Sequence, residues 1–184
     1  MDFGVKAEAN MSNFILSDMD GMKSKLGFGA SFIGFAKINI GEHFAVQPEL
    51  LFNFKNSEMK EKATKTKVDY QYFGTEIPVY AIGQMKLGNG KGYIGIGSYV
   101  GFGFDARYKA KNMDDGKLYK EYSGQKSAMQ RLDVGAGVMF GYEFNFGLQI
   151  NAGYKIGFID ALNTGKKNAT VLNETVSLGI GYRF

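Results

Sequence analysis

The sequence lacks most of the residue types on which catalytic and metal sites are built. Its 184 residues include no cysteine, no tryptophan, two prolines and one histidine. Without cysteine the chain can form no disulfide, thiolate metal site or catalytic thiol. The single histidine, His43, lies in a short turn between two strand-like segments and cannot be assigned as the base for a serine nucleophile. The carboxylates show no calcium-loop spacing. We therefore expect no enzyme activity, no cofactor and no metal.

Long apolar runs are absent as well. No stretch approaches the ~18 residues that a transmembrane helix requires. The formal charge of +4 is mild, and the sequence lacks the basic stripe of a nucleic-acid-binding protein. Residues 1–3 enter a strand pattern directly, without the basic start and apolar core of a secretory signal. Together with the pattern described next, this favours a mature chain from which a signal peptide has been removed.

What the sequence does contain is a strict two-residue alternation, most clearly over residues 130–158. Successive side chains leave a strand on opposite faces, so this pattern predicts a long hairpin that turns near Asn145. One face is wholly apolar, whereas the other holds charges and glycines. The apolar face consists of Leu132, Val134, Ala136, Val138, Phe140, Tyr142, Phe144, Leu148, Ile150, Ala152, Tyr154, Ile156 and Phe158.

The same alternation predicts eight strands along the chain. They cover residues 2–10, 26–40, 44–55, 68–87, 93–108, 130–144, 148–158 and 173–184. Predicted long loops at 11–25, 56–67, 109–126 and 161–172 alternate with short turns, an asymmetry typical of outer-membrane barrels. We therefore predict an all-β chain, in which residues 1–184 form a single eight-stranded antiparallel up-and-down transmembrane β-barrel with its apolar face toward lipid.

Two prolines and one change of parity disturb this pattern. Pro48 and Pro78 fall inside predicted strands, where a closed barrel has no free edge to hide a missing hydrogen-bond donor. Each would require a bulge or a lost ladder bond. The apolar residues of segment 68–87 change parity along its length, and a bulge near Gly74 would reconcile the two halves.

Aromatic residues concentrate near the ends of the predicted strands, as in the aromatic girdles of outer-membrane barrels. A general preference of aromatics for strands is the simpler alternative. The group at the short-turn end is Phe44, Tyr93, Tyr142, Phe144, Tyr182 and Phe184, although Tyr93 has inward parity. The group at the long-loop end is Phe54, Phe104, Tyr108 and Phe158.

Five segments of the chain resemble the outer-membrane β-barrel domain family often labelled "porin family protein", which is similar to small OmpA/OmpX-type barrels. They are FGVKAEANMSNF (3–14), EIPVYA (76–81), YIGIGSYVGFGF (93–104), RLDVGAGVMFGYEF (131–144) and SLGIGYRF (177–184). The resemblance covers the whole chain. It implies a location in a Gram-negative outer membrane and an assembly signal formed by Tyr182 and Phe184, which the barrel-assembly machinery would recognise. Most members of the family have no assigned activity.

Charged residues of both signs have inward parity. In a barrel interior they must be paired, because burying an isolated charge is very costly. They form either a structural network that plugs the barrel or the lining of a gated ion path. The residues are Lys6, Glu8, Lys37, Glu49, Glu76, Asp105, Arg107, Arg131, Asp133, Glu143, Lys155 and Arg183. We further expect Asp105 and Arg107 to face Arg131 and Asp133.

Two of the predicted long loops contain more basic than acidic residues. Segment 56–67 holds four lysines and two glutamates, and segment 109–126 holds five lysines and three acidic residues. These loops could contact lipopolysaccharide phosphates or other acidic polymers, or could simply be solvated. We interpret the chain as a monomeric structural or surface-interaction protein embedded in outer-membrane lipid. The alternatives are a small outer-membrane pore and a soluble lipocalin-like barrel that binds an apolar ligand, which the charged second face disfavours.

Overall fold

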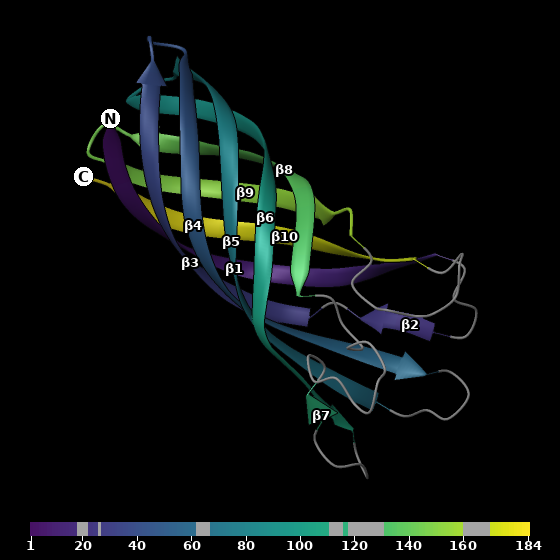
Figure 1. The fold of residues 1–184 in the computed structure, drawn as a ribbon. Helices are drawn as coiled ribbons and strands as arrows, with labels where there is room; N and C mark the ends of the chain where they lie inside the picture. Colours follow the sequence, from purple (N-terminus) through teal and green to yellow (C-terminus); the bar gives the residue numbers. More distant parts are fainter. Residues whose placement is uncertain (18–21, 26, 62–66, 111–115, 118–130, 160–169) are drawn as a thin grey trace.

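The structure, a computed structural model, describes residues 1–17, 22–25, 27–61, 67–110, 116–117, 131–159 and 170–184. Eight long antiparallel strands close into a barrel (Figure 1). They are β1 (Asp2–Ser17), β3 (Gly27–Ile40), β4 (Phe44–Glu61), β5 (Lys67–Lys86), β6 (Gly90–Ala110), β8 (Leu132–Phe144), β9 (Leu148–Gly157) and β10 (Thr170–Arg183). Each pairs with the next, and β1 pairs with β10 to close the ring. The predicted fold is therefore confirmed.

Two short strands extend the sheet beyond the ring. Strand β2 (Met22–Lys25) pairs with β4, and β7 (Gly116–Lys117) pairs with β6. The described residues contain no helix that is long and apolar enough to cross a membrane.

The barrel has two unlike ends. Both termini lie at the end that carries the short turns after β3, β5 and β8 (Figure 1). Gly41 and Gly147 occupy the left-handed region in two of these turns, with φ of 79° and 96°, where a side chain would be strained. Strands β4, β5 and β6 extend far at the opposite end, and their full lengths are 18, 20 and 21 residues. About 10 residues of a tilted strand suffice to cross the apolar zone, so these strands extend well past it.

The predicted strand ends were wrong on this long side. Residues 11–17, 22–25, 56–61, 67, 109–110, 116–117 and 170–172 were predicted as loop, but they pair as strand. Ladder hydrogen bonds do not depend on hydrophobicity, so pairing continues after the apolar contrast has ended. The remaining residues of the predicted long loops lie outside the described part of the chain.

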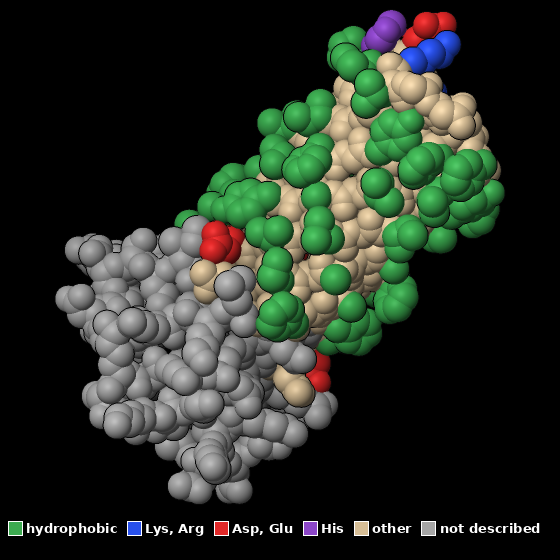
Figure 2. Space-filling view, turned by 180° about the vertical axis from the view of Figure 1, so that it is seen from behind, with side chains coloured by type: hydrophobic (Ala, Val, Ile, Leu, Met, Phe, Trp, Pro, Cys, Tyr) green, Lys and Arg blue, Asp and Glu red, His purple; other side chains and the backbone are tan. Residues whose placement is uncertain are grey.

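The two faces of the wall follow the predicted parity. Phe32, Val100, Val138 and Ile150 are exposed on the outside of the barrel, and similar apolar side chains cover the visible face of the wall (Figure 2). The inward row is buried and largely polar or charged. A lipocalin needs the opposite arrangement, with an apolar lumen, so the soluble ligand-binding alternative does not fit this wall.

Both prolines lie at interruptions of the ladder rather than at bulges. The β3–β4 register breaks off between Phe35↔Glu49 and Ile38↔Val46, where Pro48 lies, and resumes without a shift. The β4–β5 register likewise lapses opposite Pro78. A register shift of the β5–β6 ladder does lie between Phe73 and Gly74, but the bulge predicted within segment 68–87 is not found, since β5 keeps one register with β4 from Lys67 to Gly83. Because Gly103 and Asp105 are the residues of β6 paired there, the extra residue is Phe104.

Aromatic rings meet each other at both ends of the barrel. Near the short turns Tyr142 contacts Phe144, and Tyr182 contacts Phe184, with ring centroids 4.9 and 5.8 Å apart. Near the long-strand end Phe73 lies 4.8 Å from Phe54 and 5.6 Å from Phe104. The two predicted aromatic groups therefore occur at the two ends of the wall, where they are suited to the membrane interfaces. Tyr93 is buried inside, as its parity predicts.

Candidate functional site

The longest-reaching contact of the interior joins Lys37 of β3 to Glu143 of β8. Three strands separate β3 from β8 in either direction around the ring, so these strands face each other across the lumen. Lys37 Nζ lies 3.1 Å from Glu143 Oε2, and the two residues are only 2% and 4% exposed. Arg183 Nε and Gln149 Nε2 donate to the same carboxylate at 2.8 Å each. Glu143 is thus the centre of a bridge that spans the barrel.

Two further ion pairs cross the interior between strands that are not neighbours. Lys6 of β1 donates to Glu49 of β4 at 2.5 Å, and Gln47 donates to the same carboxylate oxygen at 2.7 Å. Lys155 of β9 pairs with Glu76 of β5. All four charged residues are buried. Their mutual contacts compensate for much of the hydration that each charge loses on burial.

Neutral polar side chains share the rest of the inward row with apolar residues such as Phe35, Ile82 and Met139, and the sequence analysis did not single these polar residues out. Asn151 donates to Glu8 at 2.7 Å. Toward the long-strand end Asn10 donates to Ser31, which in turn donates to Asn53. Inward parity could have identified these residues, but a short amide or hydroxyl carries no charge that requires a partner. They continue the hydrogen-bonded interior beyond the ion pairs.

Only part of the four-residue cluster expected between β6 and β8 lies within the described side chains. Asp133 is half-buried and accepts hydrogen bonds from Tyr99 at 3.1 Å and Asn173 at 3.5 Å. Arg131 precedes β8 and is exposed, so its assignment to the interior was wrong. The β6–β8 ladder ends at Phe102↔Leu132, which is short of both predicted β6 partners. Asp105 is half-buried, and the side chain of Arg107 lies outside the described part.

Buried aromatic rings lie over glycines of the neighbouring strand. Tyr99 pairs with Gly135 across β6 and β8, and Tyr93 pairs with Gly141 in the same ladder. A Cβ built on Gly135 would lie 2.6 Å from the Tyr99 ring, and one on Gly141 would lie 2.6 Å from the Tyr93 ring. The glycines therefore provide the space that the rings fill.

The predicted assembly residues lie on the outside of the barrel. Tyr182 and Phe184 are exposed at the end of β10, beside the short turns. The Phe184 amide donates to the Phe3 carbonyl at 2.9 Å, so the last residue is joined to β1. Their recognition by an assembly machinery remains a prediction from the family resemblance.

No metal-binding cluster occurs among the described residues. They contain no cluster of three or more His, Cys, Asp or Glu side chains that could hold a metal ion. His43 is exposed in the turn between β3 and β4. What the interior can do chemically is hold buried charges in fixed pairs across the lumen.

Comparison with known proteins agrees with this architecture. A family model described as "Outer membrane protein beta-barrel domain" matches residues 1–163. The chain belongs to this family. It is therefore one of the outer membrane β-barrel proteins, and the barrel is the membrane-embedded domain that the sequence predicted. No curated protein matches the chain in sequence.

Solved outer-membrane barrels share its fold. Neisserial surface protein A (NspA) has 21% sequence identity and a TM-score of 0.53, with 99% of this chain and 97% of that chain covered. OprG from Pseudomonas aeruginosa has 14% identity and a TM-score of 0.53, with 100% and 95% covered. Ail from Yersinia pestis, solved with the heparin analogue sucrose octasulfate, has 16% identity and a TM-score of 0.51, with 100% and 98% covered. At these identities the likeness concerns the fold alone.

Proposed function

We propose that this outer-membrane barrel is a non-catalytic surface-interaction protein whose interior is closed and whose long-strand end is the contact surface. The observation that carries the proposal is the Lys37–Glu143 bridge between facing strands, because an ion pair that spans the lumen obstructs a continuous water path. An eight-stranded barrel has an interior that side chains can just fill. A protein closed in this way contributes function through the parts that extend beyond the membrane.

The long-strand end has the composition of a surface that attracts anions. Segments 56–67 and 109–126 together contain nine lysines and five acidic residues, counted as four plus five and two plus three. Strands β4, β5 and β6 carry these segments beyond the apolar zone. Ail was solved with a polysulfated ligand, and ligands of that chemistry would suit these lysines. We propose lipopolysaccharide phosphates or a sulfated polysaccharide as the partner of this end.

A binding experiment on membrane-embedded protein tests this role. The monomeric chain in lipid nanodiscs should bind immobilised heparin or lipopolysaccharide, and added salt should weaken that binding. The triple variant Lys60→Gln/Lys62→Gln/Lys65→Gln should bind about tenfold more weakly, because three cations leave one surface. Lys86→Gln/Lys91→Gln, which removes two cations from the opposite end of the barrel, should bind immobilised heparin as the unchanged protein does. Equal binding by the triple variant and the unchanged protein would exclude the loops as the contact surface.

A further inference from the structure

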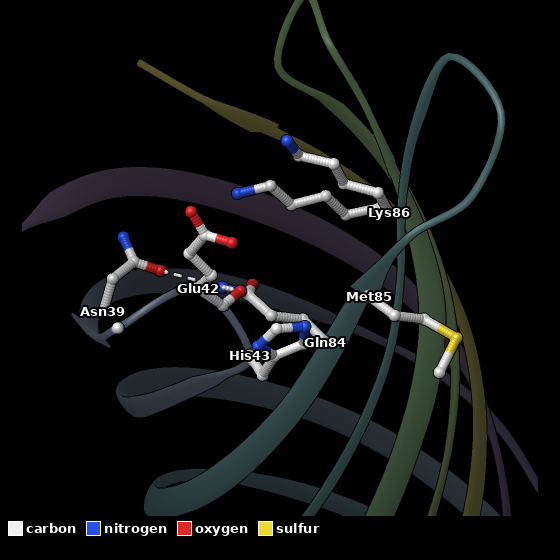
Figure 3. A pocket seen from close by; sticks show the side chains of 8 residues that line it. Asn39, Glu42, His43, Gln84, Met85 and Lys86 are labelled. Carbon is white, nitrogen blue, oxygen red and sulfur yellow. Dashed lines mark hydrogen bonds between the residues drawn. The ribbon is translucent and has the colours of Figure 1, made fainter.

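A hollow of about 550 Å³ opens at the short-turn mouth of the barrel (Figure 3). Side chains from the end of β3, the following turn, the end of β5 and the start of β6 line it. It lies apart from the long-strand end and takes no part in the ion pairs that cross the lumen. Figure 2 shows histidine, acidic and basic side chains gathered at the corresponding tip of the molecule.

Two lysines face each other at this mouth. Lys86 and Lys91 are direct partners in the β5–β6 ladder, and both have the inward parity of their strands. Like charges directly opposite each other destabilise a strand pair. Within the described part of the chain, neither ammonium group forms an ion pair or a hydrogen bond. An anion between them would relieve the repulsion, and lysine binds phosphate as a point charge.

The same hollow contains hydrogen-bond acceptors that need a donor. Gln84 is 5% exposed, and its Nε2 donates to Asn39 Oδ1 at 3.2 Å and to the Glu42 carbonyl at 3.3 Å. Its Oε1 is buried and has no hydrogen-bond partner among the described residues. The Glu42 carboxylate and the Lys86 ammonium extend toward the same open space (Figure 3). A ligand that satisfied every group would carry both a negative charge and an N–H or O–H donor.

The hollow borders the apolar outside of the barrel. Met85 lines it but points away from the polar side chains (Figure 3), and it is 64% exposed. Phe44 and Leu87 are exposed nearby on the same rim. Short turns of outer-membrane barrels face the periplasm, so this rim lies at the surface of the periplasmic leaflet. A lipid of that leaflet could place its chains against these apolar residues and its headgroup over the rim.

We propose that the hollow binds the headgroup of a zwitterionic aminophospholipid. The phosphodiester oxygens accept from Lys86 and Lys91, and the ammonium donates to Gln84 Oε1 and Glu42. The acyl chains lie against the apolar rim. A phosphocholine headgroup carries no N–H donor and leaves the Gln84 oxygen unpaired. A purely anionic headgroup places no cation beside Glu42.

Binding of short-chain lipids to the refolded full chain in a phosphate-free maltoside detergent tests the site. By calorimetry or native mass spectrometry, dihexanoyl phosphatidylethanolamine should bind about tenfold more tightly than dihexanoyl phosphatidylcholine. Lys86→Gln/Lys91→Gln should weaken phosphatidylethanolamine binding by a similar factor. Lys166→Gln/Lys167→Gln removes the same charge from segment 161–172, outside both the hollow and the two lysine-rich segments named above, and should change nothing. Lys86 is exposed and Lys91 is half-buried, and neither forms an ion pair among the described residues, so their replacement removes no ion pair of the buried network.

Three results would overturn the proposal. The first is unchanged affinity in Lys86→Gln/Lys91→Gln, which would show that the lysines hold no phosphate. The second is equal affinity for the two lipids, which would show that the acceptors select no donor. The third is binding of soluble phosphoethanolamine as tight as that of the lipid, which would show that the apolar rim contributes nothing.

Discussion

Individual residues of the interior are held by partners on several strands. Glu143 receives Lys37, Arg183 and Gln149, which come from β3, β10 and β9. Removing one member of such a group leaves the others charged and buried, and this costs more than the intact pairing contributes. The stability of the barrel therefore depends on complete sets of partners and less on any single pair.

Replacing Glu143 with Gln tests this dependence directly. Because Lys37 and Arg183 would lose their counter-charge, we expect the free energy of unfolding in detergent to fall by about 3–5 kcal/mol. In a double-mutant cycle, Lys37→Met combined with Glu143→Gln should cost less than the sum of the single changes. Glu42→Gln, which neutralises an exposed carboxylate, should cost less than about 1 kcal/mol. Strict additivity in the cycle would contradict the pairing.

Gly135 gives a second prediction at this scale. A methyl group there would lie 2.1 Å from the Ile156 carbonyl oxygen and 2.6 Å from the Tyr99 ring. Gly135→Ala should therefore lower the free energy of unfolding by about 1–3 kcal/mol, measured by urea titration. A methyl group on Gly34, by contrast, would enter open space on the outer face of β3. Gly34→Ala should leave stability nearly unchanged, and equal losses in the two variants would argue against the ring-over-glycine packing.

Among the secondary-structure elements, the strands were predictable where one face meets lipid. Val138 and the other apolar residues of its face alternate with glycines and charged residues. This contrast predicts both that the segment is a strand and which of its side chains point outward. Toward the long-strand end the two faces no longer differ, because apolar residues fall on both parities in segment 11–17 and segment 56–61 is mostly polar, yet the ladders of both segments continue. The sequence does not predict which charged residues pair across the lumen. Parity indicates that Lys37 points inward, but only the ring order brings Glu143 opposite to it.

Strand β8 gives a test of which face meets lipid. Val138 is exposed outward, and its neighbour Met139 is buried inside. An arginine at the bilayer midplane costs roughly 2–4 kcal/mol, so Val138→Arg should reduce the stability of the barrel in lipid vesicles by about that much. Val138→Leu, which keeps an apolar side chain, is the control. Unchanged stability in Val138→Arg would mean that the parity of the strand is inverted.

At the scale of the whole molecule, the barrel has an interior crossed by ion pairs and two different ends. The interior is bridged by ion pairs, the long-strand end carries the lysine-rich segments, and the short-turn mouth holds the hollow near Gln84. A wall of exposed apolar side chains connects the two ends. We propose that the long-strand end contacts external polymers and that the short-turn mouth contacts a lipid headgroup. We propose no solute path through the lumen.

Single-channel recording of the refolded chain in a planar bilayer tests the closed interior most directly. With Lys37 and Glu143 bridging facing strands, we expect no steady conductance from the unchanged protein. Lys37→Ala/Glu143→Ala removes that bridge but keeps the Lys6–Glu49 and Lys155–Glu76 pairs, so any openings should remain small and rare. Large, steady and reproducible openings in the unchanged protein would contradict the account and make the barrel a pore.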